Sequence, residues 1–229
     1  MAKKKKNSNY QTEKRELARL EKERALAAEK RKRLIKAIAI PAVAVLLIAG
    51  IILGIVGYTA GWFGFKVTHK ATIIIENYGT VELDLYGDEA PITVANFEKL
   101  AGEGFYDGLT FHRIVEGFVA QGGAPKETNG EKTPETIKGE FKANNVWNDI
   151  KHVRGTISMA RSNSYNSASS QFFIVHQDSR ESLDGLYAAF GRVTSGMEVI
   201  DKLCEGRLVD KTLPESDQPR ILSIKVEKL

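Results

Sequence analysis

The chain has 229 residues and a formal net charge of +4 at pH 7, which is a mildly basic balance. This length allows one compact domain with additional segments, or at most two small domains. A single cysteine, Cys204, excludes an intramolecular disulfide, and the four histidines lack the spacing typical of metal ligands, so no metal site is predicted. Cys204 lies on the apolar side of a predicted helix, and we interpret it as a buried packing residue.

The net charge conceals two oppositely charged parts. Residues 1–33 hold thirteen Lys or Arg against five Glu, and because the whole chain has 33 basic and 29 acidic residues, the remainder keeps 20 against 24. Residues 1–36 are rich in Lys, Glu, Arg, Ala and Leu, which favours a basic, solvated helical segment. An alternative is that the lysines at residues 3–6 contact nucleic-acid phosphates. The acidic remainder would repel phosphates, and we expect no nucleic-acid partner.

Residues 37–65 contain no charged side chain, and the apolar stretch within them is long enough to cross a hydrocarbon core of about 30 Å. We therefore predict a transmembrane helix at residues 37–61, with the lipid bilayer as its partner, and a linker at residues 62–70. A cleaved signal peptide is disfavoured, because its apolar part runs only about 7–15 residues after a short basic segment. Four Lys or Arg residues between positions 31 and 36 place the N-terminus in the cytoplasm by the positive-inside rule.

Beyond the linker, the hydrophobic pattern changes to that of strands. Residues 71–75 and 81–86 are apolar or alternate between apolar and polar, and the Asn, Tyr and Gly at residues 77–79 predict a tight turn between them. Pro91 favours the start of a helix, whose apolar residues keep helical spacing up to Gly102. Further strands are predicted at residues 109–115, 156–160, 171–175 and 221–226, and a second helix at residues 197–203.

This series of strands with two helices predicts a mainly β domain over residues 71–229, built as a closed barrel with helical caps. The sequence contains no internal repeat. Residues 124–150, with Gly, Asn and Pro scattered through them, are predicted to form a long surface loop.

One motif carries the strongest functional signal. Residues 111–123 read Phe-His-Arg-Ile-Val-Glu-Gly-Phe-Val-Ala-Gln-Gly-Gly, which resembles the F-H-R-x-x-x-x-F-x-x-Q-G-G stretch of the cyclophilins. The resemblance covers about residues 70–228. It implies a closed antiparallel barrel of eight strands, capped by two helices, that isomerises X–Pro peptide bonds without a cofactor. Residues 157–160, 170–174, 183–185 and 190–193 match further segments of the family in the same order.

The chemistry of that reaction gives Arg113 its importance. Rotation about an X–Pro bond breaks amide resonance against a barrier of roughly 18–20 kcal/mol, and no covalent intermediate is needed. In the twisted amide the proline nitrogen regains a lone pair, so a fixed cationic donor aimed at it stabilises the transition state more than the planar ground state. By resemblance, Arg113 holds this role. A guanidinium suits it, because the group stays charged and holds its N–H bonds in a rigid fork.

The resemblance also names the groups expected around the substrate. Gln121 matches a residue that binds the substrate backbone and helps to hold the arginine, so Arg113 and Gln121 are the predicted catalytic residues. His112 is assigned no acid–base role, because the reaction transfers no proton. Without the motif, the apolar residues predicted below to bind the substrate would be interpreted as ordinary barrel core. The predicted substrate-binding residues are Phe118, Val119, Ala160, Gln171, Phe173, Leu183 and Tyr187.

Three positions depart from the family pattern. Ser182 stands where many members have a tryptophan before Leu-Asp-Gly, and Tyr187 stands where a histidine is common, so the edge of the pocket differs. Arg161 follows the alanine where an asparagine is common, and the loop at residues 162–170 is one residue longer than usual. We expect substrate preference to shift at these positions.

Two functions remain open from the sequence. The first is an isomerase that accelerates the folding of exported or cell-surface polypeptides, with its catalytic domain outside a bacterial plasma membrane. The alternative is a membrane-tethered module or chaperone that holds Pro-containing segments, with incidental catalysis. Arg113 favours the enzyme, since holding a proline needs only an apolar slot, whereas rate enhancement needs the aimed cation.

Overall fold

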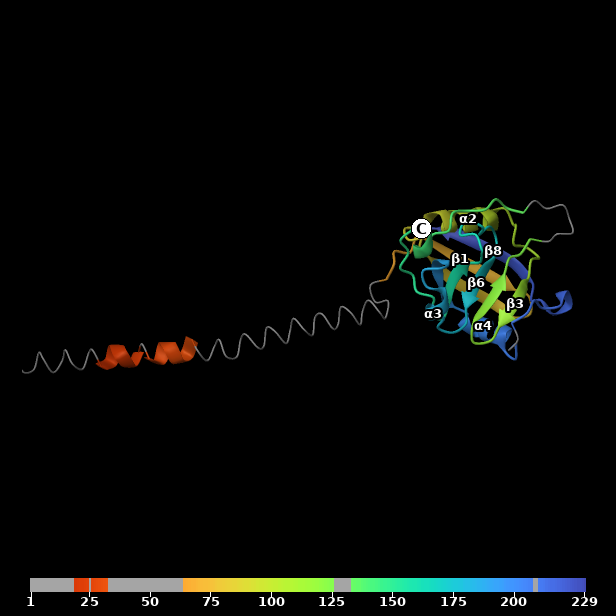
Figure 1. Ribbon diagram of the computed structural model, residues 1–229. Helices are drawn as coiled ribbons and strands as arrows, with labels where there is room; N and C mark the ends of the chain where they lie inside the picture. Colours follow the sequence, from red (N-terminus) through yellow and green to blue (C-terminus); the bar gives the residue numbers. More distant parts are fainter. Residues whose placement is uncertain (1–18, 25, 33–63, 126–132, 208–209) are drawn as a thin grey trace, which may run out of the picture. The chain divides into compact units, whose positions relative to one another are not determined.

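The computed structural model describes residues 19–24, 26–32, 64–125, 133–207 and 210–229 (Figure 1). The chain divides into two units, Met1–Gly64 and Phe65–Leu229. In the first unit, residues 19–24 and 26–32 are helical and exposed. The predicted transmembrane helix at residues 37–61 lies outside the described residues. Among the helices within the described ranges, none combines the length and the apolar character that crossing a membrane requires.

The second unit opens with the predicted β-hairpin, which is confirmed. Strands β1 (His69–Ile75) and β2 (Gly79–Leu85) pair antiparallel, with Ile73 opposite Val81. Alternate side chains of both strands are buried, as expected where one face of a strand packs on a core. Asn77 adopts a left-handed conformation with φ of 64°, which a short polar side chain tolerates in a turn.

Eight strands form one antiparallel sheet in the order β3-β4-β6-β5-β7-β2-β1-β8. The sheet curls so that its two outermost strands, β3 and β8, approach each other (Figure 1). The remaining strands are β3 (Phe111–Val115), β4 (Val119–Gly122), β5 (Thr156–Met159), β6 (Phe172–Val175), β7 (Ala188–Ser195) and β8 (Ile221–Lys228).

The prediction of a closed barrel is wrong. Strands β3 and β8 share no continuous ladder. The residues just before them, Thr110 and Arg220, form an isolated bridge, and the Gly108 N–H donates to Ile221 O at 2.8 Å. The reason lies in the segment that precedes β8. Thr212 bridges to Arg113, and the Leu213 N–H donates to His112 O at 2.8 Å, so this segment occupies the edge of β3 that β8 would need. The sheet is therefore a half-barrel.

Two strands and one helix have no counterpart in the prediction, namely β4, β7 and α3 (Arg180–Leu183). β4 has only four residues and ends in glycine, which weakens any strand signal. β7 carries Gly191 in its middle, where a Cβ would lie 2.5 Å from Asp84 O. The close approach of β2 and β7 thus requires the glycine that makes β7 a poor strand by sequence.

Two longer helices, α2 (Pro91–Gly102) and α4 (Met197–Cys204), confirm the predicted pair and lie at opposite ends of the curled sheet (Figure 1). Phe97 of α2 enters the main core, where its ring centroid lies 5.3 Å from Tyr106 and 5.6 Å from Phe172. Cys204 at the end of α4 is fully buried, which confirms its packing role.

Residues 133–150 contain no strand or α-helix and are mostly exposed or partly buried, as predicted for a surface loop, but the middle of the loop is anchored in the domain. It contains the 3-10 helix η2 (Lys142–Asn144), and it buries Glu140 and Phe141, which are 2% and 1% exposed. The Glu140 carboxylate accepts hydrogen bonds from the backbone N–H groups of Ile92 and Thr93 at 3.0 and 2.8 Å. Ala90 supplies no side-chain cap, so Glu140 satisfies the N-terminus of α2 from 48 residues along the chain.

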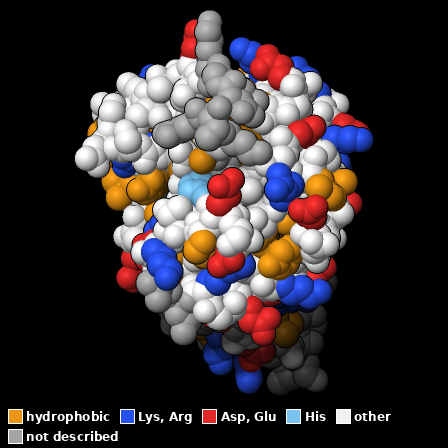
Figure 2. Space-filling model, turned by 90° about the vertical axis from the view of Figure 1, so that its right-hand side faces the viewer, with side chains coloured by type: hydrophobic (Ala, Val, Ile, Leu, Met, Phe, Trp, Pro, Cys, Tyr) orange, Lys and Arg blue, Asp and Glu red, His pale blue; other side chains and the backbone are white. Residues whose placement is uncertain are grey.

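On the face shown in Figure 2, Lys and Arg side chains lie among Asp and Glu side chains. The hydrophobic side chains there form small, separate patches. The part of this face that is not drawn in grey shows neither a large apolar patch nor charges of a single sign. A second 3-10 helix, η3 (Glu215–Asp217), precedes β8.

Candidate active site

The site grows from the alternation of side chains along β6. Successive residues of a strand point to opposite faces of the sheet. Phe172 accordingly packs in the main core, whereas Phe173 joins a second apolar cluster on the other face. That second cluster consists of Val119, Phe173, Val175 and Leu183, with Phe118, Ala160 and Tyr187 packed against it and partly buried.

Strand register brings the predicted polar residues to the same place. Arg113 of β3 lies opposite Gln121 of β4, and Gln121 lies opposite Phe173 of β6. These cross-strand pairs place the guanidinium, the amide and the aromatic ring in one row across three neighbouring strands. Phe173, the last residue of this row, belongs to the second apolar cluster.

A cavity of about 300 Å³ opens above this row. Every predicted catalytic or substrate-binding residue lines it except Gln171, which lies one contact away: its Oε1 accepts a hydrogen bond from Gln121 Nε2 at 2.9 Å. A second hollow, lined by residues 178–182, shares Ser182 with it. The cavity is lined by Arg113, Phe118, Val119, Gln121, Ala160, Arg161, Phe173, Ser182, Leu183 and Tyr187.

The Arg113 guanidinium is held from two sides. Its Nη1 donates to Gln121 Oε1 at 3.2 Å, and its Nε and Nη2 donate to the two oxygens of Asp210 at 2.6 and 2.7 Å. These bonds use three of the five guanidinium N–H groups and leave one on each terminal nitrogen. The guanidinium carbon also lies 5.6 Å from the centroid of the Phe118 ring. Arg113 is thus oriented before any substrate arrives.

Asp210 is a site residue that sequence reasoning missed. It lies 97 residues after Arg113, in a polar segment without any motif, so no local signal marks it. The bridge between Thr212 and Arg113 fixes the segment along β3 and brings the carboxylate to the guanidinium. Two parallel N–H···O bonds between arginine and a carboxylate make a directional pair, which orients the guanidinium and offsets its positive charge.

The Arg113–Asp210 pair predicts a measurable titration. The side-chain hydrogen bond from Arg113 holds the pKa of Asp210 below its ordinary value. A lowered pKa in the folded state means that the pair stabilises the fold above the ordinary aspartate pKa, and that this contribution is lost as pH falls through the lowered value. We expect carboxyl-carbon NMR to show the lowered pKa, and Arg113→Ala to raise it toward the ordinary value. An ordinary Asp210 pKa in the unmodified protein would show that the pair does not persist in solution.

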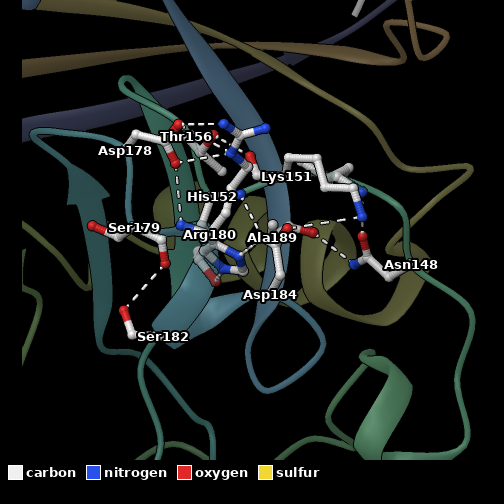
Figure 3. A network of polar contacts seen from close by, with 12 residues as sticks. Asn148, Lys151, His152, Thr156, Asp178, Ser179, Arg180, Ser182, Asp184 and Ala189 are labelled. Atoms are coloured by element: carbon white, nitrogen blue, oxygen red, sulfur yellow. Dashed lines mark hydrogen bonds and ion pairs between the residues drawn. The ribbon is translucent and has the colours of Figure 1, made fainter. Parts of the chain in front are cut away.

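A network of hydrogen bonds joins Ser158, His152 and Asp184 beneath the pocket, and Figure 3 shows His152 and Asp184 within it. His152 Nδ1 lies 3.0 Å from Asp184 Oδ1, and His152 Nε2 lies 3.0 Å from Ser158 Oγ. The imidazole stacks on the Phe173 ring with centroids 6.0 Å apart. Burial acts to raise the pKa of Asp184, but the hydrogen bonds from His152 and the nearby positive charge of Lys151 contribute to a net lowering of that pKa. Asp184 directly follows Leu183. The hydrogen-bonded network therefore helps to position two lining residues, Phe173 through the stacked imidazole and Leu183 through its neighbour Asp184.

The order Ser158, His152, Asp184 has the hydrogen-bond pattern of a serine hydrolase, but its location excludes that chemistry. Ser158 is fully buried and His152 is 1% exposed, beneath the pocket rather than in it. A nucleophile must reach a substrate carbonyl, and none can approach Ser158 Oγ. The hydrogen bonds among Ser158, His152 and Asp184 therefore have a structural role, which is to support the pocket wall at Phe173.

The lining offers a cation, an amide and apolar walls. The Ser182 hydroxyl donates to Ser179 O at 3.1 Å and has no activating base. Burial lowers the pKa of His112, so its imidazole is neutral at neutral pH. Within the ranges that the structure describes, no group of His, Cys, Asp or Glu side chains is arranged to hold a metal ion. The lining residues suit noncovalent stabilisation of a polar transition state in an otherwise apolar slot.

Comparison with known proteins agrees with this chemistry. The family model described as cyclophilin type peptidyl-prolyl cis-trans isomerase/CLD matches residues 70–226. Peptidyl-prolyl cis-trans isomerase B of Bacillus subtilis is 44% identical over 142 residues, which cover 62% of this chain and 95% of that protein. Peptidyl-prolyl cis-trans isomerase B of Escherichia coli is 43% identical over 135 residues, which cover 56% and 79%.

A solved structure is also similar to this chain. The crystal structure of a Cryptosporidium parvum cyclophilin type peptidyl-prolyl cis-trans isomerase, determined in the presence of the dipeptide Ala-Pro, aligns with a TM-score of 0.59 at 29% identity. The alignment covers 70% of this chain and 99% of that one. The family match begins at residue 70, so the basic and apolar segments before it lie outside the match.

Proposed function

The chain belongs to the cyclophilin family of peptidyl-prolyl cis–trans isomerases, and from this premise we propose that it isomerises X–Pro bonds of exported or cell-surface polypeptides from a membrane anchor. The isomerase activity is that of the family and of its named relatives. The observation that carries the assignment of the site is the row of Arg113, Gln121 and Phe173 beneath one cavity.

The apolar part of the cavity is proposed to hold the proline ring. A volume of about 300 Å³ lies at the lower limit of small-molecule sites, which suits a proline and its neighbours better than a large cofactor. Phe173 forms the wall, with the Tyr187 ring edge-on at 5.7 Å and the His152 ring stacked behind it. Because Phe173 is supported on both sides, the ring is held in place while the preceding carbonyl turns.

Arg113 is proposed to supply the electrostatic part. As the amide twists, the proline nitrogen gains lone-pair character, and an N–H on a terminal guanidinium nitrogen can donate to it. Asp210 and Gln121 hold the guanidinium beforehand, so little reorganisation is needed in the transition state. The same carboxylate offsets part of the charge, so orientation rather than net charge is the main contribution of this arginine.

The assignment is tested by the rate of exchange between cis and trans forms of a short Pro-containing peptide, measured by NMR with the full chain in detergent micelles. We expect faster exchange in proportion to protein concentration. Exchange at the uncatalysed rate, with a folded domain, would leave only the Pro-binding module or chaperone.

The membrane location rests on the sequence of the first unit. Residues 37–65 carry no charge, and basic residues crowd the N-terminal flank of this stretch. On this proposal the catalytic domain lies outside the plasma membrane of a bacterium, where its clients would be polypeptides folding after export.

Protease accessibility checks the orientation. We expect protease added to intact bacterial cells or spheroplasts to release a fragment beginning near Lys66 or Lys70, while an epitope within residues 1–36 stays protected. Permeabilised cells provide the control, in which both parts are digested. Protection of the C-terminal domain in intact spheroplasts would show the opposite orientation. Release of the whole chain by a salt wash would show that residues 37–61 do not anchor it in the membrane.

A further inference from the structure

Arg161 is a second cation in the lining of the cavity, and the mechanism above does not use it. It directly follows Ala160, just beyond the end of β5. Three aromatic rings surround its guanidinium carbon, which lies 4.7 Å from the ring centroid of Tyr187, 5.1 Å from that of Tyr165 and 5.2 Å from that of Phe141. Such contacts between a cation and aromatic faces hold the guanidinium while leaving its charge intact.

Two backbone carbonyls complete the support. Arg161 Nε donates to Leu186 O at 3.0 Å, and Nη1 donates to Ser162 O at 2.9 Å. Carbonyls and rings orient the group without neutralising it. In the part of the chain that the structure describes, no ion pair joins Arg161 to a carboxylate, and Nη2 makes no hydrogen bond. Arg161 therefore presents a positioned, uncompensated charge.

The other cation in the lining differs in this respect. Two oxygens of Asp210 face Arg113, so that guanidinium is largely compensated. The cavity thus has one cation that is paired and one that is not. A peptide in the cavity meets the unpaired charge near the Ala160 and Tyr187 part of the lining.

We propose that Arg161 is a specificity-determining residue that favours X–Pro substrates carrying an aspartate or glutamate within two residues of the proline. The proposal rests on the isomerase function assigned above. A substrate carboxylate can pair with the free edge of the guanidinium, which the aromatic rings and carbonyls already hold in place. A role in packing alone predicts no dependence on substrate charge, and this difference separates the two interpretations.

The expected preference is modest because the pair is close to solvent. Partly exposed ion pairs of this kind change an equilibrium by roughly twofold to fivefold, and salt screens them over about 10 Å at 0.1 M ionic strength. We therefore expect kcat/KM for a Glu-containing peptide to exceed that for its Gln-containing counterpart by about twofold to fivefold at one position near the proline.

The test uses the full chain in detergent micelles and three sets of five-residue peptides with central proline, in which Glu, Gln or Lys occupies each flanking position in turn. Exchange rates from NMR give kcat/KM for each peptide. In Arg161→Gln we expect kcat/KM for the Glu peptide divided by kcat/KM for the Gln peptide to fall to about one. In Arg161→Lys we expect part of the preference for the Glu peptide to remain. Lys70→Gln removes one positive charge from β1, far along the sheet from the pocket, and should leave the ratio unchanged.

The ratio is taken within one variant, so a general loss of activity does not affect it. A second measurement needs no variant: the unmodified protein is assayed at higher ionic strength, and the ratio of kcat/KM between Glu and Gln peptides should fall toward one. A ratio near one at every position in the unmodified protein, or the same ratio in Arg161→Gln, would overturn the proposal. Failure of the unmodified protein to accelerate even the Gln peptides would instead overturn the isomerase function.

Discussion

Replacing Arg113 by alanine is expected to lower kcat/KM for X–Pro isomerisation by about 10²–10³-fold, because loss of one preorganised donor to a developing charge costs about 2.7–4 kcal/mol in comparable sites. The loss should fall mainly on kcat, since the donor acts on the twisted amide and the apolar slot still binds the proline. The domain should stay folded. Arg113 lies on an outermost strand of the sheet with 27% of its side chain exposed, so its removal opens no cavity in the core.

Two further variants show which property of Arg113 matters. Arg113→Lys keeps the charge but cannot form the two parallel bonds to Asp210, so we expect an intermediate loss if orientation contributes. Arg220→Ala removes an arginine whose ion pair with Glu76 is exposed and lies outside the pocket lining, and it should leave turnover unchanged. Circular dichroism establishes that each variant is folded. Near-normal turnover by a folded Arg113→Ala protein would assign the electrostatic role to another residue.

The second large effect concerns stability and arises outside the pocket lining. Glu140→Ala is expected to lower the free energy of unfolding of the domain by about 3 kcal/mol, since each buried donor left without a partner costs about 1–3 kcal/mol. Three donors lose their acceptor: the N–H groups of Ile92 and Thr93 and the Thr93 hydroxyl, which lies 2.7 Å from the carboxylate. The favourable interaction of a carboxylate with a helix N-terminus is lost as well.

Urea denaturation of residues 65–229 measures this loss, because these residues form a compact unit with its own core. Glu140→Gln keeps the size and one acceptor oxygen, so it should cost less than the alanine variant. Isomerase activity below the unfolding transition should change little in both, since Glu140 does not line the cavity. A loss under about 1 kcal/mol in Glu140→Ala would mean that water replaces the carboxylate at the start of α2.

Local rules explain why much of the domain could be predicted from its sequence. The hairpin of β1 and β2 follows from alternation of apolar residues about a turn, and the helix starting at Pro91 follows from a fixed φ and helical spacing. The motif at residues 111–123 placed Arg113, Phe118 and Gln121 in one site, and the structure brings them to one cavity. The glycine-containing strands β4 and β7 lay beyond these rules, because pairing with neighbours rather than propensity stabilises them.

The sequence by itself determined the family, the strand alternation that sends Phe172 inward and Phe173 to the pocket, and the identity of most lining residues. Only the tertiary structure decided that the sheet stays open, that Asp210 holds Arg113, and that aromatic rings leave Arg161 unpaired. The physical reason is the distance along the chain over which each interaction acts. Backbone propensity and side-chain period act over a few residues, whereas an ion pair across 97 residues forms only after strand register has brought both groups together.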